Sequence, residues 1–133
     1  MRINQLKPML EVRAALEKYE RSLTDNDVAA VCETFWKSPH TVRYGPEGSL
    51  FGFDAIHAFR VGRSSGPPPR EEKSVQVTTF GDDFAVTHTE FQYPGQTRVG
   101  RTSQTWARIE GHWRIVSAHV SFVENERISV GIK

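Results

Sequence analysis

The sequence predicts an α+β fold, with helices first and a long antiparallel meander of strands after them. Apolar residues recur at intervals of three and four in the first part of the chain, which is typical of amphipathic helices. From residue 73 onward, extended segments are separated by turn sequences suited to hairpins, such as Gly81-Asp82-Asp83 and Pro94-Gly95. Together the two patterns predict helices that pack against one curved sheet.

Two helices are predicted before the first strand. The apolar face of the first helix consists of Met9, Val12, Leu16, Tyr19 and Leu23. Thr24 or Asp25 is expected to cap the second helix, with Asp27 in its first turn. This second helix has an apolar face within residues 28–36 and is expected to end at Ser38-Pro39, because proline disfavours helix in the residue before it.

A strand, a turn and a third helix follow. The strand covers residues 41–44, the turn covers residues 45–48, and residues 50–51 continue as an extended segment. The third helix is predicted from Ala55 to about Arg63, with Asp54 at its start. The proline-rich break at residues 64–69 is too short to be an interdomain linker, so residues 1–133 are expected to form a single domain.

Four longer strands are predicted in the second half of the chain, at residues 73–80, 84–92, 98–109 and 112–123. The last two are longer than typical strands, and long strands bend readily. A sheet that curves around the helices buries both halves of the chain and leaves a cone-shaped pocket between the helix faces and the concave sheet. The opposite face, with residues such as Trp106 or Trp113, is a candidate surface for a homodimer.

Composition narrows the function classes. The net charge of +1 gives no reason to expect a nucleic acid or a membrane surface as partner. No segment approaches the run of about 20 apolar residues that spans a bilayer. The single cysteine, Cys32, and an N-terminus without the apolar core of a signal peptide favour a cytoplasmic location. The five histidines show no metal-ligand spacing, so neither a metal nor another cofactor is expected.

Three arginines lie where the pattern predicts core. Arg43, Arg60 and Arg63 fall within the strand, turn and helix of residues 41–63, among apolar side chains. A guanidinium near apolar surface needs a partner, and a planar carboxylate fits its geometry well. These arginines therefore indicate a cavity that takes a small acidic molecule.

Four motifs carry a resemblance to a known family. They are Thr41-Val-Arg-Tyr-Gly, Phe51-Gly-Phe-Asp-Ala-Ile-His-Ala-Phe-Arg-Val-Gly-Arg, Gly100-Arg-Thr-Ser-Gln-Thr-Trp and His119-Val-Ser. On these motifs and on the order of its elements, the chain resembles the AtzH-like, or HpxZ (oxalurate catabolism), family of the SnoaL-like, nuclear-transport-factor-2-like superfamily. The resemblance implies a cone-shaped fold in which three N-terminal helices pack on a curved antiparallel sheet.

The resemblance also implies a function. It points to a small cytoplasmic amidohydrolase that acts, with or without decarboxylation, on a carboxylated urea or ureide such as 1,3-dicarboxyurea or an oxalurate-pathway compound. The implied catalytic residues are Tyr19 and Arg43, and the implied partner is a small carboxylated amide. Two alternatives stay open. One is a non-enzymatic dimer that binds ureides or carboxylates or assists an amidase, and the other is an isomerase or dehydratase with Glu33 or Glu90 as its base.

The two catalytic candidates also have structural interpretations. Tyr19 is either a core tyrosine or a donor of a proton or hydrogen bond to a developing oxyanion. Arg43 either pairs with Glu47 or Asp54 at a sheet edge or holds a substrate carboxylate in the cavity.

Four further residues are candidates for substrate binding, again with alternatives. Arg60 and Arg63 share a predicted helix face that is either solvated or part of the anion site. His119 is either an acid or base in the cavity or part of the outer face of the sheet. Gln104 either contacts the amide edge of a urea or lies at a subunit interface.

Overall fold

The fold is a curved sheet with helices on one face, as the sequence predicts. The computed structural model describes residues 1–63 and 66–124. Within them the helices are α1 (Leu6–Thr24), α2 (Val28–Thr34) and α3 (Phe53–Val61). The strands are β1 (Val42–Gly45), β2 (Gly48–Phe51), β3 (Glu71–Phe80), β4 (Phe84–Gln92), β5 (Arg98–Ile109) and β6 (His112–Glu124). The predicted α+β class and the cone-shaped arrangement of three helices on a curved sheet are confirmed.

The start of α2 differs from the prediction. Asp27, and neither Thr24 nor Asp25, caps this helix, because its side chain accepts a hydrogen bond from the Ala30 backbone N–H at 3.1 Å. Thr24 and Asp25 are already used by the preceding helix, since Thr24 is the last residue of α1 and Asp25 is its C-cap. The second helix therefore starts later than predicted, and it ends at Thr34, before the apolar pair that follows.

The third helix starts and ends earlier than predicted. Gly52, with φ of 90°, occupies the N-cap position, and the helix runs from Phe53 to Val61. A positive φ of this size suits glycine because other residues carry a Cβ that is strained there. Arg63 consequently lies beyond the C-cap Gly62 and not on the helix, although its backbone N–H still bonds to the Arg60 carbonyl at 3.2 Å.

The sheet is mixed. Its strand order is β2-β1-β6-β5-β4-β3, and β3 to β6 form the predicted antiparallel meander. The exception is the pairing of β1 with β6, which is parallel. Three reversals separate β3 from β6, so these two strands run in opposite directions, and β6 runs in the same direction as β1. The antiparallel sheet that the resemblance implies is therefore confirmed except between β1 and β6, which pair in parallel.

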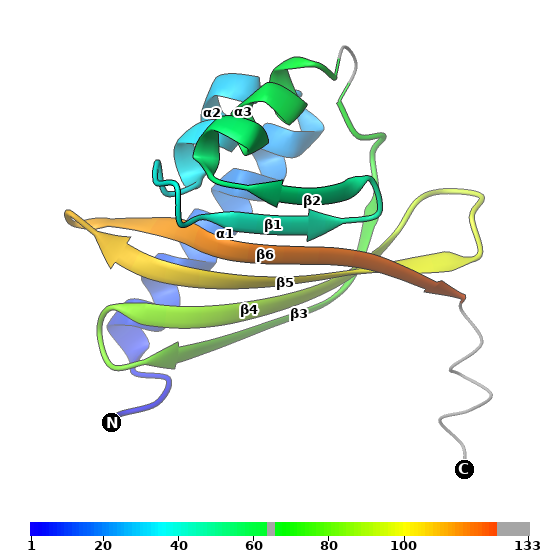
Figure 1. Cartoon of the computed structure of the whole chain (residues 1–133). Helices are drawn as coiled ribbons and strands as arrows, with labels where there is room; N and C mark the ends of the chain where they lie inside the picture. Colours follow the sequence, from blue (N-terminus) through cyan, green and yellow to red (C-terminus); the bar gives the residue numbers. More distant parts are fainter. Residues whose placement is uncertain (64–65, 125–133) are drawn as a thin grey trace.

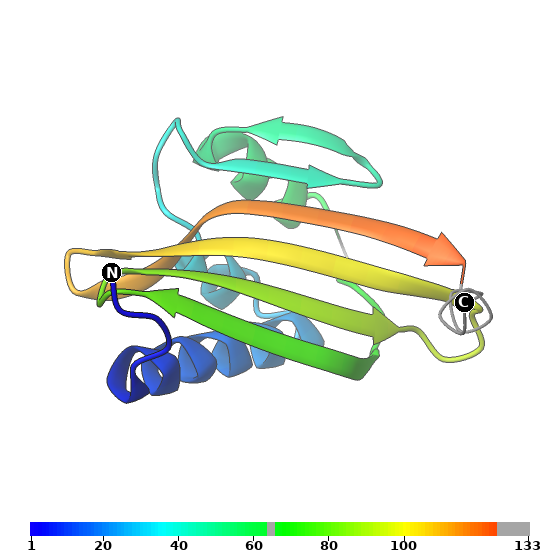
Figure 2. The same cartoon turned by 90° about the horizontal axis from the view of Figure 1, so that it is seen from below.

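The helices gather on one face of the sheet, which bends around them (Figures 1 and 2). Val12, Leu16 and Tyr19 on α1 are buried against this face, as the apolar spacing predicts. A register shift between β5 and β6 at Thr105 and Trp106 adds to the bend, since a bulge increases local twist. No helix in the described part of the chain is long and apolar enough to cross a membrane.

The outer face of the sheet differs from the prediction in its aromatic residues. Trp106 is fully buried and Trp113 is 9% exposed, and both belong to the core. The outer face instead carries polar residues such as His88, Ser103 and His119. The homodimer through the sheet stays a prediction, and neither tryptophan is available for it.

Candidate functional site

A small cavity lies between the helices and the concave face of the sheet. Its volume is about 70 Å³. The lining comes from α1, from the end of α2, from β1 and the β1–β2 turn, from α3 and the segment after it, and from β4 to β6. The lining residues are Tyr19, Leu23, Phe35, Arg43, Pro46, Glu47, Arg60, Arg63, Pro67, Arg70, Phe91, Tyr93, Thr102, Gln104, Ala118, Val120 and Phe122.

Tyr19 reaches this cavity from α1. It belongs to the buried face of the helix and is 4% exposed, with its ring packed edge-on against Phe35 at a centroid distance of 6.0 Å. Its hydroxyl makes no hydrogen bond with another described residue, and the side chain lines the cavity. Tyr19 is therefore a core residue and a cavity residue at once, which places a phenolic O–H where a ligand can meet it.

Arg43 enters the cavity from β1. Strand alternation turns Arg43 inward and Tyr44 outward, and Arg43 is directly opposite Ala118 on β6, which also lines the cavity. The side chain is buried, with 5% exposure. Its Nη1 lies 3.4 Å from Oε1 of Glu47 in the β1–β2 turn. The predicted pairing with Glu47 and the predicted position in the cavity are thus both present.

The charge of Arg43 is only partly compensated. Burial lowers the pKa of the Arg43 guanidinium, and the nearby charge of Arg60 lowers it further. Tyr19 and Glu47 act in the opposite direction. Since Glu47 is half-exposed, its carboxylate is a weak partner for a buried cation. A bound anion would supply the missing charge.

Arg60 and Arg63 complete the basic wall. The guanidinium carbons of Arg43, Arg60 and Arg63 lie 5.1, 5.5 and 5.4 Å from the ring centroid of Phe59. Arg60 is 7% exposed, and its Nε is buried without a hydrogen-bond partner among the described residues. Arg63 is more exposed and lies 4.0 Å from the Glu47 carboxylate. The three arginines singled out from the sequence therefore do meet at one cavity.

Gln104 lines the cavity from β5. It is 3% exposed, and its Oε1 accepts a hydrogen bond from the hydroxyl of Thr87 on the neighbouring strand. Of the two roles that the sequence allows, the structure places Gln104 on the cavity side and away from the outer face.

An aromatic wall closes the other end of the cavity, and sequence reasoning missed it. Phe91, Tyr93 and Phe122 pack edge-on or stacked on one another, and the Arg70 guanidinium lies 3.9 Å from the centroid of the Phe91 ring. Both Glu20 carboxylate oxygens accept from Arg70 Nη2, at 2.6 and 2.8 Å. The signal in the sequence was Gly100, since a strand glycine often marks a close approach of another group.

His119 does not line the cavity. Ala118 and Val120 point inward from β6, so strand alternation turns His119 to the outer face, where its ring packs edge-on against Tyr44 at 5.6 Å. It lies there in a shallow hollow with His88 and Ser103. The sequence left both faces open for His119, and the structure selects the outer one.

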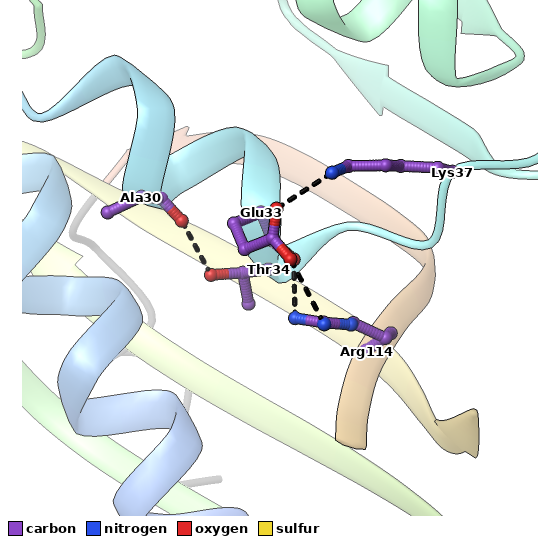
Figure 3. Close-up of polar contacts among 5 residues, drawn as sticks. All are labelled: Ala30, Glu33, Thr34, Lys37 and Arg114. Atoms are coloured by element: carbon purple, nitrogen blue, oxygen red, sulfur yellow. Dashed lines mark hydrogen bonds and ion pairs between the residues drawn. The ribbon is translucent and has the colours of Figure 1, made fainter. Parts of the chain in front are cut away.

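Neither carboxylate considered as an isomerase base reaches the cavity. Glu33 bonds to Lys37 at 2.7 Å and to Arg114 at 3.1 Å on the far side of α2 (Figure 3). The hydrogen bond from Lys37 is the main reason that the pKa of Glu33 is lowered. Glu90 lies on the outer face, opposite Arg101.

The cavity is thus positively charged and rich in hydrogen-bond donors. Four arginines and a single carboxylate, Glu47, are charged among the described lining residues. The excess of positive charge is local, because the whole chain carries only +1. Nowhere in the described residues do three or more His, Cys, Asp or Glu side chains form a group that could hold a metal ion.

Comparison with known proteins gives a consistent result. The family model described as AtzH-like matches residues 1–126. A solved protein of unknown function from Pectobacterium atrosepticum is 44% identical, with a TM-score of 0.88, over 92% of this chain and 95% of the other. A cystatin-like fold protein from Burkholderia xenovorans is 42% identical, with a TM-score of 0.88, over 93% and 98%. A nuclear transport factor 2-like superfamily protein from Salmonella enterica is 26% identical, with a TM-score of 0.70, over 86% and 89%. No curated protein matches the sequence.

Proposed function

The chain belongs to the AtzH-like family, and from this we propose that it is a small amidohydrolase that acts, with or without decarboxylation, on a carboxylated urea or ureide. The single observation that carries the proposal is the juxtaposition of Tyr19 with Arg43 and Arg60 in one cavity. Arginines alone would make a carboxylate receptor, whereas a phenol on the same wall adds a proton donor.

The charges of the site support a carboxylated ligand. Arg43 and Arg60 are both more than nine-tenths buried, and their described surroundings offer them only Glu47. Two like charges in a poorly hydrated site repel each other more strongly than in water. A carboxylate bound between the two guanidinium groups would relieve this repulsion.

The proposed chemistry breaks one bond between carbon and nitrogen. Arg43 and Arg60 hold one carboxylate of the substrate, which orients the scissile amide toward Tyr19. Water adds to the amide carbon, and the Tyr19 hydroxyl donates its proton to the nitrogen that leaves with the electron pair of the bond. The tyrosinate, which lies next to Arg43, then takes the proton that the added water gives up, so that the acid product is released and the phenol is restored.

An N-carboxylated urea allows a second course for the same bond. Its carboxylate carbon can leave as CO₂ without attack by water, because the electron pair of the bond returns to the nitrogen and Tyr19 protonates that nitrogen. For this course the arginines must hold the other carboxylate. The departing one loses its charge as CO₂ forms, so binding it would stabilise the ground state more than the transition state and slow the reaction.

A binding role without catalysis is the second candidate, and the excess of arginines over carboxylates in the cavity lining favours it. An isomerase is not supported, because Glu47 is the only carboxylate among the described lining residues and it already pairs with Arg43.

The test is a turnover assay with carbon-13-labelled candidates. We would offer oxalurate, urea-1-carboxylate and freshly prepared 1,3-dicarboxyurea to the purified protein and follow the loss of substrate and the labelled products, bicarbonate, CO₂, urea and oxalate, by NMR. Turnover of one of them above the rate without protein supports the proposal. Saturable binding in calorimetry without turnover would assign the binding role, and neither binding nor turnover of any would overturn both.

A further inference from the structure

A buried chain of hydrogen bonds ends at the cavity wall. Trp106 Nε1 donates to Thr87 Oγ1 at 2.9 Å, and Thr87 Oγ1 donates to Gln104 Oε1 at 3.1 Å. Trp106 and Thr87 have no solvent exposure. Thr87 and Gln104 are directly opposite each other on β4 and β5, so the backbone of the sheet holds their spacing.

The order of donors in this chain follows from chemistry. An indole N–H can only donate, so Thr87 Oγ1 must accept from Trp106. The hydroxyl of Thr87 has one proton, and in this fully buried position Gln104 Oε1 is the acceptor within reach. A reversed amide would place its N–H₂ against Thr87 and leave the Thr87 proton without an acceptor, which is costly in the core.

The other end of the Gln104 amide therefore faces the cavity. Its Nε2 has no hydrogen bond to another described residue, and it is not one of the described polar atoms that are buried without a partner. Nε2 must then reach accessible space, which for this side chain is the cavity. Gln104 thus presents two N–H donors and no acceptor.

We propose that Thr87 and Trp106 are positioning residues that fix the Gln104 amide, and that the amide selects ligands with a neutral carbonyl oxygen beside their carboxylates. The selection rests on the proposed function, because it presumes an anion held by Arg43 and Arg60. The Gln104 amide adds a requirement that the arginines do not impose, namely a carbonyl oxygen in the ligand. A dicarboxylate without a carbonyl between its charged groups satisfies the arginines and leaves the Gln104 donors without an acceptor.

Two dianions of equal chain length test this requirement, with 3-oxoglutarate prepared freshly for each titration because a β-keto acid loses CO₂ in water. Glutarate has a methylene at its centre, and 3-oxoglutarate has a carbonyl at the same place, so the pair differs in one acceptor oxygen. We expect the wild-type protein to bind 3-oxoglutarate about tenfold more tightly than glutarate in calorimetry, as for one additional hydrogen bond.

The variants separate positioning from packing. Thr87→Val keeps the shape of the side chain and removes the hydroxyl, and we expect the affinity ratio of the two dianions to fall to near one with little change for glutarate. Thr87→Ser keeps the hydroxyl and should keep the ratio. A ratio that survives in Thr87→Val, or that is lost equally in Thr87→Ser, would overturn the inference.

A ligand-free measurement tests the orientation of the Gln104 amide independently of the proposed function. If neither dianion binds, the anion site fails, but proton exchange with water still decides the orientation of the amide. The Gln104 Nε2 protons should exchange rapidly while the Trp106 indole proton is protected. Protected Gln104 protons would show the reversed amide and overturn the inference.

Discussion

Arg43 and Arg60 come from β1 and α3, yet both guanidinium groups lie against the ring of Phe59 and both side chains are more than nine-tenths buried. Like charges this close raise the free energy of the ligand-free protein, since burial and mutual repulsion both oppose them. Contact with an aromatic face offsets part of that cost. An anion bound at this point would therefore lower the free energy of the protein.

Replacement of Arg60 should improve stability while it weakens binding. Arg60→Met keeps a long apolar stem and removes the charge and the unpaired Nε, so we expect unfolding to become harder by about 1–2 kcal/mol. Affinity for 3-oxoglutarate should fall at least about 30-fold, because a buried charge pair is lost. Thermal unfolding and calorimetry measure the two effects. Arg13→Met on the exposed side of α1 is the control, and a less stable Arg60→Met protein with unchanged affinity would contradict the prediction.

Tyr19 should matter for turnover more than for binding. Tyr19→Phe keeps the packing against Phe35 and removes the hydroxyl, so kcat should fall about 100- to 1000-fold with KM nearly unchanged. Steady-state kinetics on the substrate found by the labelled assay measure this. Tyr44→Phe on the outer face is a matched control with the same chemical change. Full turnover by Tyr19→Phe would exclude Tyr19 as the proton donor.

Glu47 competes with the ligand for the arginines. Its carboxylate lies 3.4 Å from Arg43 and 4.0 Å from Arg63, so it offsets part of the positive charge that would attract an anion. Glu47→Gln removes this internal competitor, and we expect anions to bind about threefold to tenfold more tightly. Calorimetric titration with 3-oxoglutarate tests the change, and Glu71→Gln, which removes an exposed carboxylate paired with Lys73, is the control. Weaker binding by Glu47→Gln would instead show that Glu47 contacts the ligand.

How far the sequence predicts this site depends on the element that carries each residue. The spacing on the first helix predicts that Tyr19 is buried, and the contrast between charge and apolar surroundings singles out Arg43 and Arg60. Whether His119 and Gln104 reach the cavity depends on which face of the sheet each side chain occupies. The alternation within one strand does not tell which of its two faces is concave. That choice depends on which residues the helices cover, and therefore on tertiary packing.

Two features needed the folded chain. Arg70 reaches the cavity only because the meander begins at the edge of the sheet farthest from β1, beside α1 and Glu20. The aromatic wall contains Phe91 and Phe122, whose strands are not neighbours in the sheet, so no local sequence pattern predicts their contact. The parallel pairing of β1 with β6 also needed the folded chain, since the relative direction of the two strands depends on how many times the chain reverses between them.

Replacement of Gly100 by alanine should destabilise the protein unless the side chain at position 91 is also made smaller. A Cβ at position 100 would lie 2.2 Å from Phe91 Cζ, and the ring is held by Tyr93 and Phe122 on other sides. We expect Gly100→Ala to destabilise the protein by about 1–3 kcal/mol, because an overpacked core must shift. Phe91→Leu in the same chain should restore part of this loss. Denaturation of the two single variants and the double variant measures the coupling, and strictly additive effects would contradict the clash.

Acid should weaken the contact that ties α1 to the β5–β6 hairpin. Glu11 accepts from Arg108 at 2.5 Å and from Trp113 at 3.1 Å, and the Arg108 hydrogen bond is the main reason that the pKa of Glu11 lies below its ordinary value of 4.5. A carboxyl group with a lowered pKa in the folded state stabilises the fold above its ordinary pKa and loses this contribution as the pH falls through the lowered value.

Glu11→Gln separates this contribution from the rest of acid unfolding. The amide still accepts from both donors but has no charge, so we expect a loss of about 1 kcal/mol near pH 7, at the low end for a half-exposed charged hydrogen bond. The difference from wild type should stay constant above the ordinary pKa of 4.5 and shrink as the pH falls below it. Urea denaturation at pH 7 and at several acidic values measures the difference, with the exposed Glu17→Gln on the same helix as control. A difference that is the same at every pH would show that Glu11 acts through packing and not through its charge.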